Sequence, residues 1–413
     1  MFQPDREEFL SSSVNDGPLP KLQRQGIGLS LSGGGFRASL FHLGALRRLN
    51  ELGILHHLDT ISSVSGGSIM NAFLAATLPF PLSAPVQDWE NVISKPLRKF
   101  CSQNIRRKPI LKGLLPWESN SKALAEQYDS LLTRGKLISQ LPPAKPLFVF
   151  CGTDLVYGVN WIFTQPRTGD YQAGYLSPIP ADWKLSTAVA VSSCFPPVFK
   201  PVSLNFDPKK LTGGKAQGPT RNENIRKLTF SDGGVYDNLG LEPIWKTHKT
   251  VLCSDGGALF DSNAGKTFFW NVKRWLAIPE NQALAVRKRW LISSFGDSSA
   301  NGLDGTFWGI GSAREKYRLA GGGYLSGGYS KALATEVIGC IRTDLDGFSE
   351  AEAAVLENHG YWLADAGVSV HLPPPLRPDP YPPLLLPHPE WADEQKVREA
   401  LKDSWKRTVF GRG

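Results

Sequence analysis

A serine near the N-terminus stands in a sharp turn between a strand pattern and a helix pattern. The segment Ile61–Ser68 reads ISSVSGGS, in which Ser65 follows an apolar run and precedes two glycines. A nucleophilic serine in such a turn needs small residues two positions before and after it, so that its Oγ can project. Gly67 meets this condition, and Ser63 stands where the common G-x-S-x-G pattern has glycine. Ser65 is therefore a candidate nucleophile, and a turn without chemistry is the alternative.

Three consecutive glycines begin the helix pattern that precedes this serine in the chain. The segment Ser32–Ser39 reads SGGGFRAS, so Gly33, Gly34 and Gly35 present backbone N–H groups at the positive end of a helix dipole. Such a turn can hold an oxyanion or a phosphate. A dinucleotide-binding pattern fails at Ala38, and the segment 265–267 lacks the first glycine of a phosphate loop, because position 260 is Phe.

Two aspartates, each followed by two glycines, are candidates for the base that would activate the serine. Asp232 stands in SDGGVYDNLG after a short strand pattern, and Asp255 stands in SDGGA after another. An aspartate at the carboxyl end of a strand can approach a nucleophile when the next residues are small. An Asx-turn without a catalytic role is the alternative for either aspartate. The motif alone does not choose between them.

A Ser-His-Asp triad would need one of the seven histidines. His359, in ENHGY, comes late enough for the chain order Ser, Asp, His of the α/β-hydrolases. A histidine that packs or caps near a helix end is the alternative for this position. His42 lies on the first helix pattern and is expected to be structural.

The patterns around these motifs predict alternating strands and helices. Helical spacing occurs at Phe36–Leu52 and Ser68–Leu78, each after a strand-like run. Two strand-turn-helix units in succession predict parallel strands with right-handed crossovers. The expected strands are Gly26–Ser32, Asp59–Val64, Leu147–Cys151, Val159–Phe163, Leu228–Phe230, Thr250–Cys253 and Trp290–Phe295. We therefore expect a mixed or parallel sheet with helices on both faces.

Residues 79–145 have no strand pattern and contain helical stretches at Trp89–Phe100 and Ser121–Leu132, which indicates a helical insertion. This insertion contains a basic run without acidic residues, made of Lys95, Arg98, Lys99, Arg106, Arg107, Lys108 and Lys112. Residues 373–389 contain nine prolines and are expected to run as extended polyproline along the surface. A last helix is expected at Trp391–Trp405.

Composition places the chain among globular proteins. Its 413 residues are 41% hydrophobic and 20% charged, which excludes a disordered, collagen-like or coiled-coil chain. The net charge of +8 favours an anionic partner, either a phospholipid surface or a nucleic acid. Five widely spaced cysteines without a C-x-x-C pair argue against a disulfide framework or a zinc site and favour a reducing compartment. Neither a signal peptide nor a membrane span is expected from the apolar pattern.

Three motifs together resemble the patatin-like phospholipases, which include the cytosolic phospholipases. They are GGGFR at Gly33–Arg37, S-x-S-G-G at Ser63–Gly67 and DGGVYDN at Asp232–Asn238. The resemblance covers about residues 26–260 and includes STAVAVSSCFPPVF at Ser186–Phe199, which matches the family's small-residue helix before F-P-P. It implies a three-layer α/β/α fold around a central, mostly parallel sheet. It also chooses Asp232 over Asp255, because VYDNLG follows only the former.

The resemblance implies a chemistry as well. Ser65 would be the nucleophile of a Ser-Asp dyad and Asp232 its only base, with no cofactor and no metal. Gly33, Gly34, Gly35 and Arg37 would form the oxyanion turn, in which the N–H groups of Gly34 and Gly35 donate and Arg37 holds the loop or a lipid phosphate. The substrate would be a phospholipid or another lipid ester.

The same interpretation gives expected domain boundaries and an expected location in the cell. We expect an N-terminal extension over residues 1–25, a catalytic domain over 26–372, the Pro-rich segment 373–389 and a C-terminal helix over 390–413. The location would be cytoplasmic, with peripheral attachment to an anionic membrane surface. A dyad without histidine predicts that activity persists as the pH falls through the histidine range.

Two other functions remain open from the sequence. One is an esterase with a Ser-Asp-His triad that uses His359. The other is a protein without catalysis that binds membranes or nucleic acid. Basic and aromatic residues also occur together at Trp270–Trp290, namely Lys273, Arg274, Trp275, Arg287, Lys288 and Arg289. No zinc finger, helix-turn-helix or RNP motif accompanies them, so nucleic acid is not the expected partner.

Overall fold

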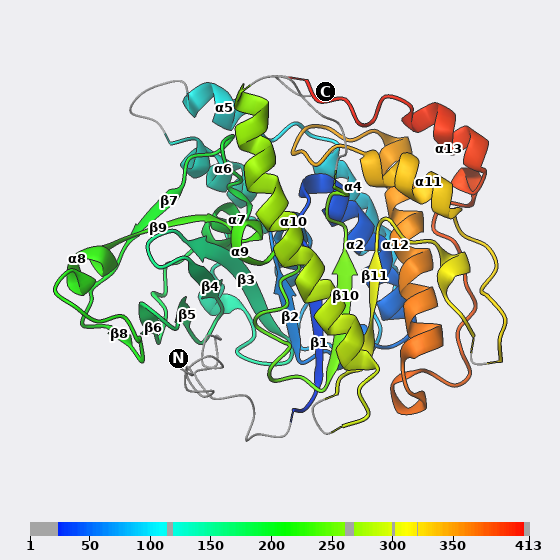
Figure 1. Cartoon of the computed structure of the whole chain (residues 1–413), viewed down its shortest axis with the longest axis horizontal. Helices are drawn as coiled ribbons and strands as arrows, with labels where there is room; N and C mark the ends of the chain where they lie inside the picture. The colour runs from blue at the N-terminus through cyan, green and yellow to red at the C-terminus, as the bar shows by residue number, and fades with distance from the viewer. Residues whose placement is uncertain (1–23, 114–118, 261–267, 300–301, 320, 409–413) are drawn as a thin grey trace, which may run out of the picture.

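One 11-stranded mixed sheet organises the chain (Figure 1). The computed structural model describes residues 24–113, 119–260, 268–299, 302–319 and 321–408. The centre of the sheet consists of parallel strands, in the spatial order β11 (Asp304–Gly309), β10 (Thr250–Asp255), β1 (Ile27–Leu31), β2 (Thr60–Ser63) and β3 (Leu147–Asp154).

An antiparallel extension continues the sheet beyond β3. It consists of β4 (Val159–Phe163), β5 (Thr168–Asp170), β6 (Gly174–Leu176) and β8 (Leu211–Thr212). A branch leaves the sheet at the far end of β3, where β9 (Lys227–Asp232) pairs with β3 and β7 (Val202–Asn205) pairs with β9. This branch determines where Asp232, the last residue of β9, lies.

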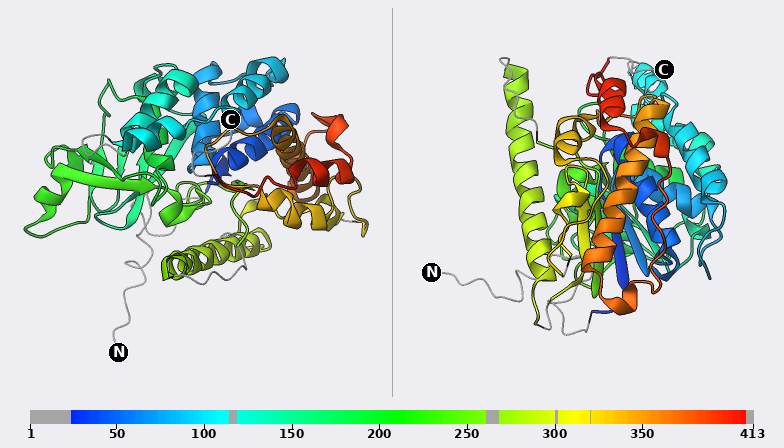
Figure 2. Two further views of the ribbon diagram at one scale, coloured as in Figure 1. Left: turned by 90° about the horizontal axis from the view of Figure 1, so that it is seen from above. Right: turned by 90° about the vertical axis from the view of Figure 1, so that its right-hand side faces the viewer.

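Helices cover both faces of the sheet, as Figure 2 shows. One face carries α2 (Gly35–Glu51), α3 (Gly66–Thr77), α7 (Leu185–Ser193) and α12 (Glu350–His371), and the other carries α9 (Gly234–Asp237) and α10 (Phe268–Phe295). Leu252 of β10 packs in the large core on the α2 side, whereas its neighbours Val251 and Cys253 pack with Leu291 of α10. The expected three-layer α/β/α fold is confirmed.

Most of the predicted elements are confirmed. The predicted strands fall on β1, β2, β3, β4, β9 and β10, and the predicted helices fall on α2, α3 and α7. The strand expected at Trp290–Phe295 is wrong, because these residues form the last turns of α10. A short apolar run cannot distinguish a strand from a buried helical turn. Helix α12 was not among the predicted elements, and its residues are buried nearly all round.

The insertion and the remaining connections are helical. Residues 79–145 contain the π-helical turns η2 (Glu90–Ser94) and η3 (Asp129–Thr133) and the helices α4 (Lys95–Cys101), α5 (Arg107–Gly113) and α6 (Asn120–Tyr128). The other helices are α8 (Arg221–Arg226), α11 (Lys331–Glu336) and α13 (Glu394–Leu401), the last shorter than expected. Short 3-10 turns are η1 (Leu55–His57), η4 (Ile138–Gln140), η5 (Arg314–Lys316), η6 (Ile338–Cys340), η7 (Pro374–Leu376) and η8 (Pro389–Trp391).

Helices α2 and α12 cross with their backbones in contact. A Cβ on Gly44 would lie 1.8 Å from the carbonyl oxygen of Glu357, and a Cβ on Gly360 would lie 1.9 Å from that of Phe41. Only glycine permits this approach, because any side chain would separate the helices. The contact joins a late segment of the chain to the helix that follows the first strand.

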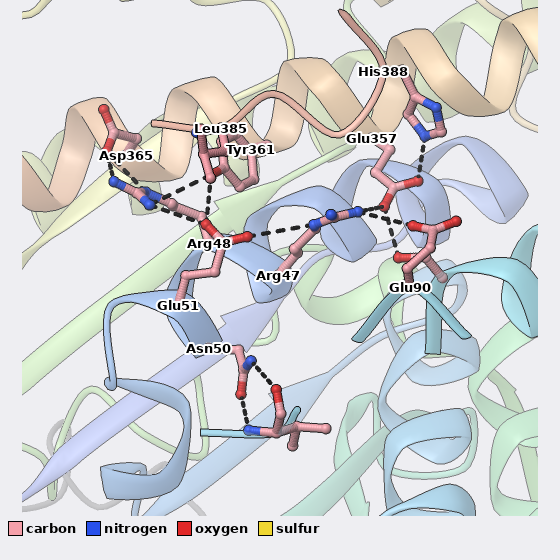
Figure 3. A network of polar contacts seen from close by, with 12 residues as sticks. Arg47, Arg48, Asn50, Glu51, Glu90, Glu357, Tyr361, Asp365, Leu385 and His388 are labelled. Atoms are coloured by element: carbon pink, nitrogen blue, oxygen red, sulfur yellow. Dashed lines mark hydrogen bonds and ion pairs between the residues drawn. The ribbon is translucent and has the colours of Figure 1, made fainter. Parts of the chain in front are cut away.

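A buried polar network fastens the same two helices to their neighbours (Figure 3). The fully buried Arg48 donates from Nε to Asp365 of α12 at 3.0 Å and from Nη2 to the carbonyl oxygen of Pro382 at 2.7 Å. Glu357 of α12 contacts Arg98 of α4 and accepts from His388 at 2.9 Å. The Pro-rich segment is therefore held against α2 and α12, and it contains a 3-10 turn instead of being extended throughout.

No helix in the described ranges combines the length and the apolar character needed to cross a bilayer.

The α2–α12 contact predicts an unusual sensitivity to a single methyl group. Gly360→Ala should lower the free energy of unfolding by about 3 kcal/mol or more, since the new Cβ meets backbone that cannot move alone. Urea denaturation followed by circular dichroism measures this change. Gly321→Ala is the matched control, because a Cβ there meets nothing within 4 Å, and it should change stability by less than about 0.5 kcal/mol. Equal effects of the two substitutions would contradict the close packing.

Candidate active site

Ser65 occupies a strained turn between β2 and α3. Its φ of 50° and ψ of −115° are rare for a residue with a side chain. Its backbone N–H donates to the carbonyl oxygen of Ser192 at 3.1 Å and to the Ser192 hydroxyl at 3.0 Å, which holds the turn. The residue after it must be small, because a Cβ on Gly66 would lie 2.1 Å from the carbonyl oxygen of Gly35. The local geometry is that of a nucleophile elbow.

The departure of Ser63 from the common elbow pattern has a local explanation. Its hydroxyl donates to the carbonyl oxygen of Val149 on β3 at 3.0 Å and accepts from Ser68 at 2.9 Å. The side chain thus fits as a hydrogen-bonded member of the sheet core, although the sequence pattern usually has glycine there.

Asp232 reaches Ser65 because two strands end face to face along β3. Parallel β2 pairs with β3 up to Ser63, opposite Phe150, and antiparallel β9 pairs with β3 up to Asp232, opposite Gly152. The strand β9 therefore continues in the place where β2 stops, and it runs in the opposite direction. The carboxyl ends of both strands meet, and both Ser65 and Asp232 line one cavity.

Burial makes the Asp232 carboxylate a stronger base than an exposed aspartate. Desolvation raises the pKa of Asp232 to about 7, against the opposing effects of the Gly234 N–H and the Ser65 hydroxyl. Oδ1 accepts from Gly234 at 2.7 Å, whereas buried Oδ2 accepts no hydrogen bond from the described residues. The Ser65 hydroxyl influences the carboxyl without yet having hydrogen-bond geometry, as is common before substrate binds.

The backbone N–H groups of the glycine turn have two different roles. Some face the cavity, and one donates a hydrogen bond that holds the turn in place. Gly34 and Gly35 line the cavity, with φ values of 141° and 58°, and their N–H groups donate to no acceptor in the described part of the chain. The Gly33 N–H is already used, since it donates to the carbonyl oxygen of Asn238 at 3.0 Å. Two of the three candidate glycines are therefore free to bind an oxyanion.

Arg37 supports the turn from behind. Its buried guanidinium donates to the carbonyl oxygens of Gly256 at 3.0 Å, Gly339 at 3.0 Å and Ile341 at 2.7 Å. The side chain does not line the cavity. Of the two roles expected for Arg37, holding the loop agrees with these contacts, whereas a direct contact with an oxyanion or a lipid phosphate does not.

The cavity has a volume of about 200 Å³ and a mixed lining. Its apolar wall consists of Phe195, Val198, Phe199 and Leu345. Polar and charged groups come from Arg106, Ser193, Asn238, Glu280, Thr343, Asp344 and Arg407. The family motif marked the segment with Phe195, Val198 and Phe199, but no sequence signal indicated the residues after 240, which only the folding of distant segments brings to the cavity.

The rival residues lie elsewhere. The carboxylate of Asp255 forms an ion pair with Lys288 Nζ at 2.5 Å, and the nearby Lys288 charge helps to lower its pKa although burial alone would raise it. His359 is buried within α12, where Nε2 lies 2.8 Å from the carbonyl oxygen of Ile310, and burial lowers its pKa to about 4. His42 is buried likewise between Ser254 and Ser32. None of these residues lines the cavity.

The two remaining sequence features are the basic run of the insertion and the incomplete phosphate-loop pattern. Within the basic run of the insertion, Arg98 contacts Glu90 and Glu357, and Arg106 pairs with Asp344 at 2.9 Å, so these two arginines serve the interior. Lys95, Lys99, Arg107, Lys108 and Lys112 remain exposed. The incomplete phosphate-loop pattern at 265–267 lies outside the described residues.

The opposite environments of Asp232 and Asp255 predict stability changes of opposite sign. At pH 8 the fold must hold an ionised Asp232, whose pKa is raised, so Asp232→Asn should increase the free energy of unfolding by on the order of 2 kcal/mol. This gain should shrink as the pH falls towards 4, because Asp232 then becomes protonated in the folded protein. Asp255→Asn should instead destabilise the protein by about 2 kcal/mol at pH 8, because it leaves Lys288 without its partner. Urea denaturation at several pH values measures both, and equal signs at pH 8 would refute the assignment.

A comparison with family models agrees with the motifs. A family model described as patatin-like phospholipase matches residues 29–245, which is more than half of the chain. No curated protein sequence matches. Human GIVD cytosolic phospholipase A2 is similar in structure, with 13% identity over 97% of this chain and 63% of that chain and a TM-score of 0.48. Its complex with methyl gamma-linolenyl fluorophosphonate has a TM-score of 0.43 at 13% identity, over 96% of this chain and 63% of that chain.

A more distant likeness is VipD from Legionella pneumophila, with 11% identity over 84% of this chain and 67% of that chain and a TM-score of 0.31. The chain thus spans less than two thirds of the human phospholipase chain. The family model, by contrast, covers the glycine turn, the serine elbow and the Asp-Gly-Gly motif in one continuous match. The chain belongs to the patatin-like phospholipase family.

Proposed function

We propose that the chain hydrolyses acyl esters of lipids, with Ser65 as the nucleophile and Asp232 as the base. Membership of the family supports a lipid hydrolase in general. The observation that carries the specific proposal is the shared cavity, in which the strained Ser65, the buried Asp232 and the N–H groups of Gly34 and Gly35 meet. No histidine is needed for this set.

The chemistry follows from these groups. Ser65 Oγ attacks the ester carbonyl carbon while Oδ2 of Asp232 takes its proton. The N–H groups of Gly34 and Gly35 stabilise the oxyanion that develops on the carbonyl oxygen. Asp232 then gives the proton to the leaving alkoxide, and an acyl ester on Ser65 remains. Water, deprotonated by Asp232, attacks this ester, and the proton returns to Ser65 as the fatty acid leaves.

The cavity wall and the charge of the chain suggest the substrate. The apolar side chains of Phe195, Val198, Phe199 and Leu345 suit an acyl chain, and Arg407 is a cationic group beside them. A phospholipid or a related lipid ester fits both features. A cytoplasmic location at the periphery of an anionic membrane belongs to the same proposal, on the basis of the net charge of +8 and the five cysteines.

The triad alternative finds no support in the geometry. His359 lies within α12 and contacts the Ile310 carbonyl instead of the cavity. A membrane-binding protein without catalysis would bind vesicles and release no fatty acid.

A fluorophosphonate probe and lipid hydrolysis test the nucleophile. Ser65→Ala should abolish labelling and reduce turnover by about 10³-fold or more, because it removes the attacking atom. Asp232→Asn should reduce turnover by a similar factor, because an amide cannot take the proton. Ser193→Ala is the matched control: Ser193 also lines the cavity, but its hydroxyl lies 3.0 Å from Tyr128 Oη and donates to Val189. Labelling that persists in Ser65→Ala would refute Ser65 as the nucleophile. Fatty acid release by Asp232→Asn at the wild-type rate would refute the dyad.

The pH dependence of kcat/KM reports on the base in the free enzyme. Since burial raises the pKa of Asp232 to about 7, activity should fall tenfold for each pH unit below about 7, as Asp232 becomes protonated. This differs from the sequence-based expectation that activity persists through the histidine range, which rested on the ordinary pKa of an aspartate. His359→Gln should keep the same acidic limb. A limb that moves with His359→Gln, or activity that stays constant down to pH 5, would contradict Asp232 as the titrating base.

A further inference from the structure

Helix α10 is fixed to the protein along one face. Leu291 is fully buried in the small core beneath it. Lys288 forms its ion pair with Asp255, and Arg287 Nε lies 3.4 Å from Oδ1 of Asp237. Two basic side chains of this helix therefore turn towards the protein, where they pair with carboxylates near the ends of β9 and β10.

The opposite face of α10 presents large apolar side chains to solvent. The side chains of Trp275, Ile278, Val286 and Ile292 are 60%, 44%, 58% and 55% exposed. Figure 2 shows the helix on the outside of the molecule in two perpendicular views, with no other described element on its outer side. A surface helix of a soluble protein normally has the reverse arrangement, with its charges outward. This face is therefore suited to an apolar or interfacial surrounding.

Charge and residue type indicate what that surrounding is. The exposed Arg289 lies on the same outer stripe and pairs with no carboxylate in the described part of the chain. Arg274, in the N-terminal part of α10, lies over the ring of Phe260 at 4.0 Å, so a second positive charge is held near that end of the helix. Tryptophan, aliphatic and basic side chains together are typical of helices that lie in the interface of an anionic bilayer.

The inner side of the same helix adjoins the cavity. Glu280, on the inner side of α10, lines the cavity with Ser65. Phe195 and Val198 also line it, and they are 46% and 44% exposed. The cavity beside α10 thus also has exposed apolar side chains in its lining.

We propose that the outer face of α10 (Trp275, Ile278, Val286, Arg289 and Ile292) docks onto a bilayer that contains anionic phospholipid. The inference rests on the proposed function, because it names the surface from which the lipid ester is taken. It does not depend on the catalytic residues themselves.

Vesicle flotation tests the docking surface. Full-length Ser65→Ala protein, which cannot digest the vesicles, is floated with phosphatidylcholine vesicles that do or do not contain phosphatidylglycerol. Trp275→Ser with Ile278→Ser, and separately Val286→Ser with Ile292→Ser, should weaken binding to the anionic vesicles by about 10-fold or more. Arg289→Ala should weaken binding only where phosphatidylglycerol is present.

Leu385→Ser is the matched control. Leu385 is 68% exposed, and its backbone N–H donates to Tyr361 of α12 (Figure 3). Helix α12 lies on the other side of the sheet from α10. This substitution should leave vesicle binding unchanged. Circular dichroism, and hydrolysis of the soluble ester p-nitrophenyl butyrate after Ser65 is restored, show whether each variant is folded.

Three outcomes would overturn the inference: no vesicle binding by the parent protein, binding by both double variants that equals binding by the parent protein, or a dimer in light scattering that these variants dissociate. The last result would assign the face to a second copy of the chain. Hydrolysis of the soluble ester without vesicle binding would refute only the docking surface. Vesicle binding without hydrolysis would refute only the proposed function.

Discussion

The site depends on the direct contact between the first turns of α2 and α3. These helices start from the neighbouring parallel strands β1 and β2, and a Cβ on Gly66 would lie 2.1 Å from the Gly35 carbonyl oxygen. Because no side chain separates the two backbones, the serine of one turn lies beside the N–H groups of the other. The proposed nucleophile and the proposed oxyanion donors are therefore positioned by main chain, which is more rigid than any pair of side chains.

Other parts of the structure preserve this contact from behind. Arg37 binds three carbonyl oxygens of the segments that follow β10 and α11, and α12 lies against α2 with glycine at the crossing. The last third of the chain thus supports the α2 end of the site and supplies part of the cavity wall. The proposed catalytic residues all lie within the first 240 positions, but they therefore depend on the rest of the chain.

Burial and strand geometry determine the pKa and the position of Asp232, the proposed base. Asp232 becomes a neighbour of Ser65 because β9 continues beside β3 at the point where β2 stops. Burial removes water from the carboxylate there, and no cation of the described residues pairs with it. Its pKa therefore rises towards neutrality. Asp255 is buried as well, but Lys288 compensates its charge. The same residue type, with the same following glycines, therefore has opposite properties in the two places.

The sequence alone determined the features that depend on neighbours along the chain. Small residues around Ser65, the glycines before α2 and the apolar spacing of α2 and α3 are local requirements, and each could be predicted with its correct position. Only the tertiary structure decided which glycine N–H groups are available, since the Gly33 donor is used by Asn238. It also decided that Trp290–Phe295 is helical and that Arg98 and Arg106 serve the interior. These outcomes depend on hydrogen bonds, ion pairs and desolvation between residues far apart in the sequence, which no local pattern encodes.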